Sequence, residues 1–481
     1  MASSISGCEK RASFDGDAES LTKSSTPKHD NKQASEFERK TIRQVDWRML
    51  PLLALLYAVA LIDRTNTGIA RVAGMGAALK LSVGERYSII SCIYFVPYTL
   101  LQLPGNLVLR WVGAREWVTF LVISWGAVEL GMGFAQNWHV LALCRALLGV
   151  FESGFFPAMV FIITTWYRRF EVQKRLAIFY LFSIFIGGFS SIFAYVLTLL
   201  KGRGGLQGWQ WIFIIEGIIT IALGIIGWFF IVDFPDKNRF LTKEQTELIL
   251  ARVEADRGDS VPDEVTFRKV VKHLCDWTIW ANGLMFMCTA MPSYAVGYFI
   301  TIILSGMGWG ITDSLLLTAP PYVFAAIITY IFAHYSDSTG MRAPFIVAQA
   351  LLTMLGCLLT LYVSQDGVRY FGLFLTCGGA AASVPGVLAY GSNNVREHSK
   401  RAVSTAVTVA MGGIGGIFAT TVFREQDAPM YLPGMWATIG CQLFMIALVG
   451  CTTFTFMKRN KERREGKVET LEGASDFYYT L

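Results

Sequence analysis

Apolar stretches of membrane-spanning length recur along the whole chain and constrain its fold more than any other feature. An α-helix rises about 1.5 Å per residue, so roughly 20 apolar residues cross the roughly 30 Å hydrocarbon core of a bilayer. Because lipid offers backbone groups no hydrogen-bond partners, only helices and closed barrels span it. The sequence therefore predicts an all-α membrane protein with twelve transmembrane helices, near residues 49–69, 87–108, 116–135, 140–166, 176–200, 209–232, 277–305, 315–335, 344–363, 369–390, 402–423 and 435–457.

Composition and motif content favour a membrane protein without catalytic activity. Of the 481 residues, 53% are hydrophobic and 16% are charged, well below the roughly 25% charged residues of soluble domains. The net charge of +6 does not indicate nucleic-acid binding, because the basic residues lie between apolar segments and at the tail. The nine cysteines form no CxxC pair, and no HExxH, GxSxG or GxxxxGK[ST] motif occurs. We expect neither an enzyme nor a metal or cofactor site.

The longest internal polar segment, residues 233–276, separates six predicted spans from six others. Such a 6+6 pattern is typical of transporters built from repeats, so we predict two six-helix bundles, residues 47–232 and 277–457. Within the central segment, Thr242 and Gln245 have the spacing of a helix capping box. Lys and Arg are enriched in the loops on the side of the two ends, which places both termini in the cytoplasm. Residues 1–46 are then a disordered cytoplasmic N-terminus, 233–276 a cytoplasmic loop, and 458–481 a cytoplasmic tail.

Ionisable side chains interrupt the apolar spans of the first six-helix bundle. Each costs roughly 2.5–3.5 kcal/mol near mid-membrane, so each needs a structural or functional reason. Arg145 and Glu152 are seven residues apart, which is about two turns along one helical face. Glu152 is therefore expected near the bilayer midplane. The interrupting residues are Asp63, Arg64, Glu129, Arg145, Glu152 and Glu216.

These charges favour an anion site coupled to protons. The arginines at 64 and 145 would bind a carboxylate, because the guanidinium fork matches it and stays charged. Asp63 and Glu152 would take and release a proton, since burial disfavours an ionised carboxylate and a nearby arginine favours it. The alternative is a purely structural role, with ion pairs Arg145–Glu152 and Asp63–Arg64 holding helices together. Glu129 and Glu216 are interpreted mainly as such interhelical contacts.

Aromatic and glycine residues add candidates for cavity lining and helix packing. Tyr94, Tyr98 and Gln102 follow one another at helical spacing and form a polar strip, with Tyr98 as a cavity-lining candidate against a simple packing role. The glycine clusters at 187–188, 378–379 and 412–416 predict close helix contacts. Three tyrosines of the second bundle, Tyr294, Tyr298 and Tyr390, are candidates to shape a pocket.

Several motifs resemble those of one transporter family. They are the helix-1 segment Asp63-Arg64-Thr65-Asn66-Thr67-Gly68, the helix-4 segment 145–157 with Trp166-Tyr167-Arg168-Arg169, the helix-6 entry 208–217, the exit Asp233-Phe234-Pro235-Asp236, and Asp427-Ala428-Pro429 with Tyr431. In these the chain, from about Asp46 to Lys458, resembles the anion:cation symporter family of the major facilitator superfamily. The likeness is to its fungal branch of allantoate, nicotinate, pantothenate and biotin permeases.

The resemblance implies two six-helix bundles around a central cavity. It also implies proton coupling by Asp63 and Glu152 and substrate contacts from Arg64, Arg145 and Tyr98. Two pairs, Glu129 with Glu216 and Asp337 with Arg342, are structural or gating candidates. The loop after helix 2 reads Arg110-Trp111-Val112-Gly113 and lacks the Asp-Arg pair common in the superfamily, and Ser338 replaces a common arginine in the second copy.

The function expected from these features is secondary active transport. We expect proton-coupled import of a small organic anion, such as nicotinate, pantothenate or allantoate, by alternating access in the plasma membrane. The protein would be a monomer in lipid and use the proton gradient without a cofactor. Export of a fungal secondary metabolite is the alternative, and a nutrient receptor without transport is a third interpretation. The sequence does not identify the substrate.

Overall fold

A computed structural model describes residues 28–238, 240–258, 267–396, 398–428, 430–468, 470–472 and 477–481. The chain divides into two units, Met1–Val45 and Asp46–Leu481. The described part of the first unit is helical and belongs to α1 (Lys28–Ala70), with the Thr41 hydroxyl donating to the Phe37 carbonyl at 2.9 Å. Disorder was expected over 1–46, but from Lys28 the chain is helical, because Glu, Lys, Arg and Gln are good helix formers. Residues 1–27 lie outside the described part.

The helices of the first half precede the central polar segment. After α1 the chain makes a π-helical turn at Arg71–Met75 and a short α2 (Gly76–Ala78). The fourth and fifth predicted spans are each split into two helices, α5 with α6 and α7 with α8. The remaining elements are α3 (Arg86–Val112), α4 (Ala114–Met132), α5 (Trp138–Glu152), α6 (Phe155–Trp166), α7 (Arg169–Gly188), α8 (Ser190–Thr198), a 3₁₀ turn (Arg203–Gly205) and α9 (Gly208–Phe230).

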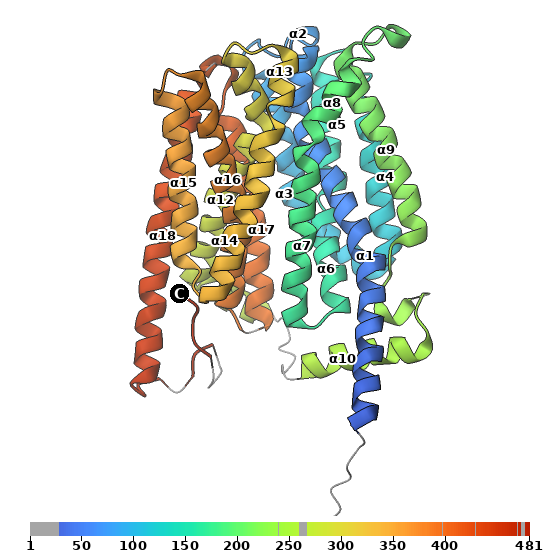
Figure 1. The fold of residues 1–481 in the computed structure, drawn as a ribbon, viewed down its shortest axis with the longest axis vertical. Helices are drawn as coiled ribbons and strands as arrows, with labels where there is room; N and C mark the ends of the chain where they lie inside the picture. Colours follow the sequence, from blue (N-terminus) through green and yellow to red (C-terminus); the bar gives the residue numbers. More distant parts are fainter. Residues whose placement is uncertain are drawn as a thin grey trace, which may run out of the picture. The chain divides into compact units, whose positions relative to one another are not determined.

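The second half repeats this all-helical organisation. A 3₁₀ turn (Pro235–Lys237), α10 (Lys243–Gly258) and α11 (Phe267–Leu274) form the described part of the central segment. The helices that follow are α12 (Trp277–Gly306), α13 (Ile311–Leu316), α14 (Ala319–Thr339), α15 (Ala343–Tyr362), α16 (Asp366–Asn393), α17 (His398–Val422) and α18 (Leu432–Arg464), with a 3₁₀ turn (Glu425–Asp427) before α18. Within the second unit, the blue-to-green helices gather on one side and the yellow-to-red helices on the other (Figure 1).

The predicted membrane protein is confirmed by helix length and hydropathy. Among the described residues, ten helices are long and apolar enough to cross a membrane. The second and third predicted spans correspond to α3 and α4, which are 27 and 19 residues long. Both carry polar or charged residues within the helix, including Gln102 in α3 and Arg115, Glu116 and Glu129 in α4. The all-helical architecture agrees with two bundles of six transmembrane helices.

Close helix packing depends on glycine, as the sequence predicted. A Cβ added at Gly416 of α17 would overlap the Phe95 ring of α3. A Cβ at Gly188 would lie 2.8 Å from the Tyr322 Cβ, so α7 and α14 approach each other here as well. Small residues let backbones come this near, which gains dispersion energy in a membrane where helices have no hydrophobic driving force to associate.

The central segment and the tail are tied to the helix ends. Thr242 and Gln245 form the predicted capping box, with backbone-to-side-chain distances of 3.1 and 3.3 Å, and α10 begins at the next residue. Lys400 of α17 forms ion pairs with Asp276, which caps α12, and with Glu472 of the tail, each at 2.7 Å. Burial raises the pKa of the Asp276 carboxyl. Hydrogen bonds from Lys400 and Thr278 lower this pKa by more, so the net pKa lies below its ordinary value.

Candidate functional site

The charged residues of the first half are buried in protein. Asp63 and Arg64 of α1 are 1% and 4% exposed, and Arg145 and Glu152 of α5 are 0% and 2% exposed. Their side chains therefore face neighbouring helices, as expected for ionisable groups in a membrane span. The two helices bring all four residues into one region.

Arg64 pairs with Glu152. The Nη2 and Nε atoms of Arg64 both donate to Oε1 of Glu152, the Nε bond measuring 3.1 Å. Its Nη1 donates to the Tyr294 hydroxyl at 3.3 Å. The alternative Arg145–Glu152 ion pair is therefore wrong. Although Arg145 and Glu152 share a helix, it is the Arg64 side chain, from α1, that binds one oxygen of the Glu152 carboxylate.

Arg145 has no carboxylate partner among the described residues. Its Nη2 donates to the carbonyl oxygen of Arg64 at 3.0 Å and to the Tyr298 hydroxyl at 3.2 Å, and its Nη1 reaches the carbonyl oxygen of Asp63 at 3.4 Å. Its buried Nε has no hydrogen-bond partner in the described part of the chain. A fully buried guanidinium held only by neutral acceptors keeps its charge uncompensated and is suited to binding an anion.

Tyrosine rings surround both guanidinium groups. The Arg64 Cζ lies 4.9 Å from the Tyr98 ring centre, 5.5 Å from that of Tyr94 and 5.9 Å from that of Tyr294. The Arg145 Cζ lies 5.4 Å from the Tyr94 ring centre and 5.9 Å from that of Tyr298. These distances fall within the range of cation–π attraction. The predicted polar strip of α3 thus meets the arginines.

The third tyrosine proposed for the pocket lies elsewhere. Tyr390 of α16 donates to the Thr452 hydroxyl of α18 at 3.1 Å and packs against Phe456 with ring centres 6.0 Å apart. It is 1% exposed and belongs to the core of the second half. Its place in a helix of the second bundle made it a candidate, but Thr452 satisfies its hydroxyl inside that bundle.

Asp63 turns away from Arg64 and joins two glutamates. Its Oδ2 accepts hydrogen bonds from Trp125 Nε1 and the Thr220 hydroxyl, both at 3.0 Å. Carboxylate oxygens of Asp63, Glu129 and Glu216 lie within 4.8 Å of one another. Consecutive residues of an α-helix point about 100° apart, which sends Asp63 and Arg64 to different neighbours. The alternative Asp63–Arg64 ion pair is therefore wrong.

The two halves contact each other through α1, α3 and α12. The Tyr87 hydroxyl donates to the carbonyl oxygen of Tyr298 at 3.3 Å, and Phe95 contacts Tyr294 with ring centres 4.8 Å apart. A Cβ at Gly68 would overlap the same Tyr298 carbonyl, so α1 and α12 touch through their backbones. Arg145 and Tyr298 continue this interface into the charged region.

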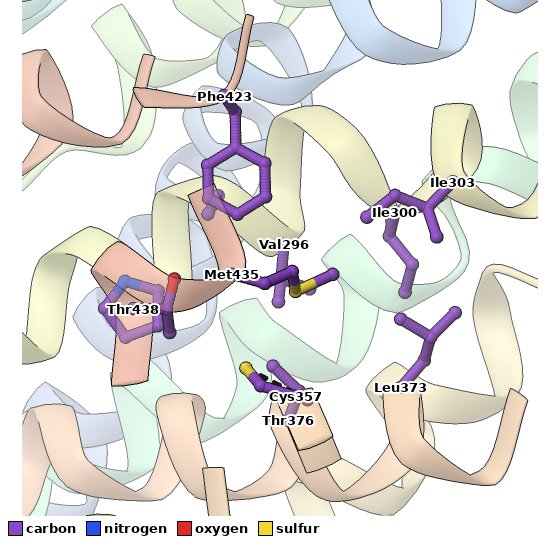
Figure 2. Close-up of a pocket in the computed structure, with 11 residues that line it drawn as sticks. Val296, Ile300, Ile303, Cys357, Leu373, Thr376, Phe423, Met435 and Thr438 are labelled. Carbon is purple, nitrogen blue, oxygen red and sulfur yellow. Dashed lines mark hydrogen bonds between the residues drawn. The ribbon is translucent and has the colours of Figure 1, made fainter. Parts of the chain in front are cut away.

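An apolar cavity lies within the second half of the chain. Figure 2 shows it between α12, α15, α16 and α18, closed by Phe423 just after α17, with the side chains of hydrophobic residues, threonines and a cysteine around it. None of its lining residues is charged or belongs to the arginine cluster. It therefore offers no charged partner to an anion. The lining residues are Pro292, Ala295, Val296, Ile300, Ile303, Cys357, Leu373, Thr376, Phe423, Met435 and Thr438.

The other gating candidates lie at the end of α14. Arg342 forms an ion pair with Asp337 at 2.5 Å, and its Nη1 donates to the Ser336 hydroxyl at 3.1 Å. Its backbone N–H donates to the carbonyl oxygen of Leu481 at 2.6 Å, which attaches the tail to this turn. The structure thus pairs the two residues but separates them from the arginine cluster.

Known proteins similar to this chain are transporters. A model of the Major Facilitator Superfamily matches residues 53–420. An uncharacterized transporter of Schizosaccharomyces pombe is 32% identical over 91% of this chain and 87% of its own length. The major facilitator-type transporter hxnP of Emericella nidulans is 30% identical over 90% and 89%, and the high-affinity nicotinic acid transporter of Saccharomyces cerevisiae is 27% identical over 89% and 79%.

Solved structures share the fold. A bacterial homolog of the human lysosomal transporter Spinster, in an inward-facing and unoccupied conformation, aligns with a TM-score of 0.66. The alignment covers 88% of this chain and 98% of that chain at 15% identity. At this level of identity the likeness supports the architecture of two helix bundles.

Proposed function

Since the chain belongs to the Major Facilitator Superfamily and is a membrane transporter rather than an enzyme, we propose that it imports a small organic carboxylate together with a proton. The observation that carries this proposal is Arg145, a fully buried guanidinium without a carboxylate partner in the described part of the chain. Such a group lowers the electrostatic cost of bringing an anion into the protein.

The charge balance around Arg145 favours a monoanion. Arg64, Arg145 and ionised Glu152 together carry one net positive charge, which attracts a carboxylate. Tyr94 and Tyr98 of α3 present ring faces to the guanidinium groups. A planar carboxylate can stack against these rings while its oxygens accept from the arginines. The nicotinic acid transporter among the relatives is consistent with a substrate of this shape.

The Arg64–Glu152 pair supports proton coupling. Both Nε and Nη2 of Arg64 point at one oxygen of Glu152, so an anion must compete with this carboxylate. Protonation of Glu152 removes its charge and frees Arg64 for the substrate. One proton then enters with each monoanion, and the region keeps its net charge. Release of the proton on the other side restores the pair and expels the anion.

Uptake by vesicles containing the purified protein tests this proposal. Labelled nicotinate, pantothenate and allantoate are offered at external pH 5 and pH 7 with an internal pH of 7. We expect faster accumulation of at least one acid at pH 5 and its loss on adding a protonophore. If the uptake of every acid is the same at both external pH values and is unaffected by the protonophore, proton coupling is contradicted. Efflux from preloaded vesicles against the proton gradient would favour export instead.

We further propose that the protein is a monomer in the plasma membrane with both termini in the cytoplasm. The enrichment of Lys and Arg in loops on the side of the termini supports this orientation. A cysteine introduced at Glu462 of the tail should react with a membrane-impermeant thiol reagent only after cells are permeabilised. Reaction in intact cells would reverse the orientation.

A further inference from the structure

Three carboxyl groups meet beside the anion site without a cationic partner. Asp63 of α1, Glu129 of α4 and Glu216 of α9 are 1%, 0% and 4% exposed, and their nearest carboxylate oxygens lie within 4.8 Å of one another. Among the described residues, no lysine, arginine or histidine forms an ion pair with any of them. Three ionised carboxylates at such spacing repel one another strongly in a buried region. The cluster therefore requires bound positive charge.

A buried amide points into the same cluster and is only partly satisfied. Asn66 of α1 is 0% exposed, and its Nδ2 donates to Glu129 and, at 2.9 Å, to Glu216. Its Oδ1 has no hydrogen-bond partner in the described part of the chain. One oxygen each of Asp63, Glu129 and Glu216 is equally unpartnered. Four buried acceptor oxygens thus lack a hydrogen-bond donor, and the O–H groups of protonated carboxyls would supply donors.

The donors around the cluster favour protons over a metal ion. Trp125 Nε1 and the Thr220 hydroxyl both donate to Asp63, and the Asn66 amide donates to the two glutamates. N–H groups directed at the carboxylates would repel a metal cation placed among them. A protonated carboxyl, in contrast, donates to a neighbouring carboxylate or to Asn66 Oδ1 and still accepts these bonds.

We propose that Asp63, Glu129 and Glu216 together form a proton-binding site, separate from the anion site, that stores and passes on the protons used in transport. The inference rests on the proposed function. The charged groups that face this site from α5 are Arg145, which donates to the Asp63 carbonyl oxygen, and Glu152. Arg64 follows Asp63 in α1. The two arginines carry two positive charges, and the four carboxyls of the region carry four negative charges when all are ionised. Two bound protons therefore make the region neutral, and a bound monoanion requires a third proton.

Substitution of both glutamates tests the site. The double variant E129Q/E216Q keeps the size of the side chains but leaves Asp63 as the sole carboxyl. We expect proton-driven accumulation to fall more than tenfold, while exchange of external for internal substrate at equal pH is retained. Retained exchange shows that the variant folds and binds. The matched control is E247Q, which removes an exposed carboxyl from α10.

The single variants refine the assignment. In E129Q or E216Q the remaining carboxyls lose a like charge, so the pH midpoint of uptake should move to more acid values by about one unit or more. If wild-type uptake depends on the proton gradient and the double variant still accumulates substrate fully, the three-carboxyl site is overturned but the proposed function is not. Wild-type uptake indifferent to that gradient would overturn the proposed function. Accumulation driven by a sodium gradient at constant pH would replace the proton by sodium.

A measurement without substitutions covers variants that fail to fold. Carbodiimides react with protonated buried carboxyl groups, so treatment of the wild-type protein should label Glu129 or Glu216 more at pH 6 than at pH 9, as read by peptide mass spectrometry. Added substrate should change this labelling if the site exchanges protons during transport. Absence of labelling at both glutamates at either pH would overturn the proposal.

Discussion

Replacing Arg145 by lysine tests the anion site while keeping the positive charge. Arg145 already makes three hydrogen bonds to protein, two to carbonyl oxygens of α1 and one to Tyr298. A lysine ammonium has three N–H donors and would use all of them to replace these bonds. Arginine has five donors, and its Nε is unpartnered among the described residues. Lysine at this position would therefore offer the anion charge but no donor in reserve.

The expected loss follows from one hydrogen bond to a charged group. Such a bond contributes about 1.5–3 kcal/mol, and each 1.4 kcal/mol changes an equilibrium constant tenfold. R145K should therefore weaken substrate binding by about 10- to 150-fold, and R145M should lose binding beyond that range because the charge is removed as well. Equilibrium binding of labelled nicotinate, or of the acid found in the uptake screen, to purified protein in lipid nanodiscs measures both values.

The matched control is R424K, because Arg424 pairs with Asp427 in the loop before α18 and is 39% exposed. Its binding constant should equal that of the wild type. Thermal unfolding of R145K establishes that the variant is folded before its affinity is interpreted. An R145K protein that unfolds normally and binds every transported anion with unchanged affinity would refute the assignment of Arg145 to the site.

Three further substitutions probe the same region. E152Q removes the carboxylate that competes for Arg64, so substrate affinity should rise and depend less on pH, while accumulation against a gradient falls at least tenfold. Binding that keeps the full pH dependence of the wild type in this variant would contradict the coupling scheme. Y298F removes a hydroxyl that accepts from Arg145 and should weaken binding by about 2- to 12-fold, from the 0.5–1.5 kcal/mol of a typical hydrogen bond, as measured by the same titration. G68A places a methyl group on the Tyr298 carbonyl oxygen, so uptake should fall sharply although binding to detergent-solubilised protein persists, and normal uptake would show that this contact is not needed.

The charges of the first half were predictable because a bilayer makes them conspicuous. In a soluble protein Arg145 or Glu129 would be one of many charged residues, but within an apolar span each ionisable group is costly. Counting turns along α5 also put Arg145 and Glu152 on one side of the helix, and the structure buries both. The capping box at Thr242 and the close contacts at Gly416 were equally visible, since both depend on local spacing.

The partners of these charges were not predictable from spacing. Periodicity relates residues within one helix, whereas Glu152 is bound by Arg64 from another helix. The distribution of side chains between α1, α4 and α9 likewise depends on how the helices rotate about their axes. A small rotation of α1 would exchange the neighbours of Asp63 and Arg64. For the same reason the sequence could not separate two tyrosines of the second half, Tyr298, which touches Arg145, and Tyr390, which packs inside its own bundle.

The adjacency of Asp63 and Arg64 gives α1 a central place in the proposed coupling. The two side chains leave consecutive backbone positions in directions about 100° apart, one towards the carboxyl cluster and the other towards Glu152. Arg145 in turn holds the carbonyl oxygens of the same two residues. Any shift or rotation of this turn of α1 changes the proton site and the anion site together. Proton binding at the carboxyl cluster can then alter the affinity of the anion site through a single turn of α1. The proposed symport therefore does not require a longer chain of residues to connect the two sites.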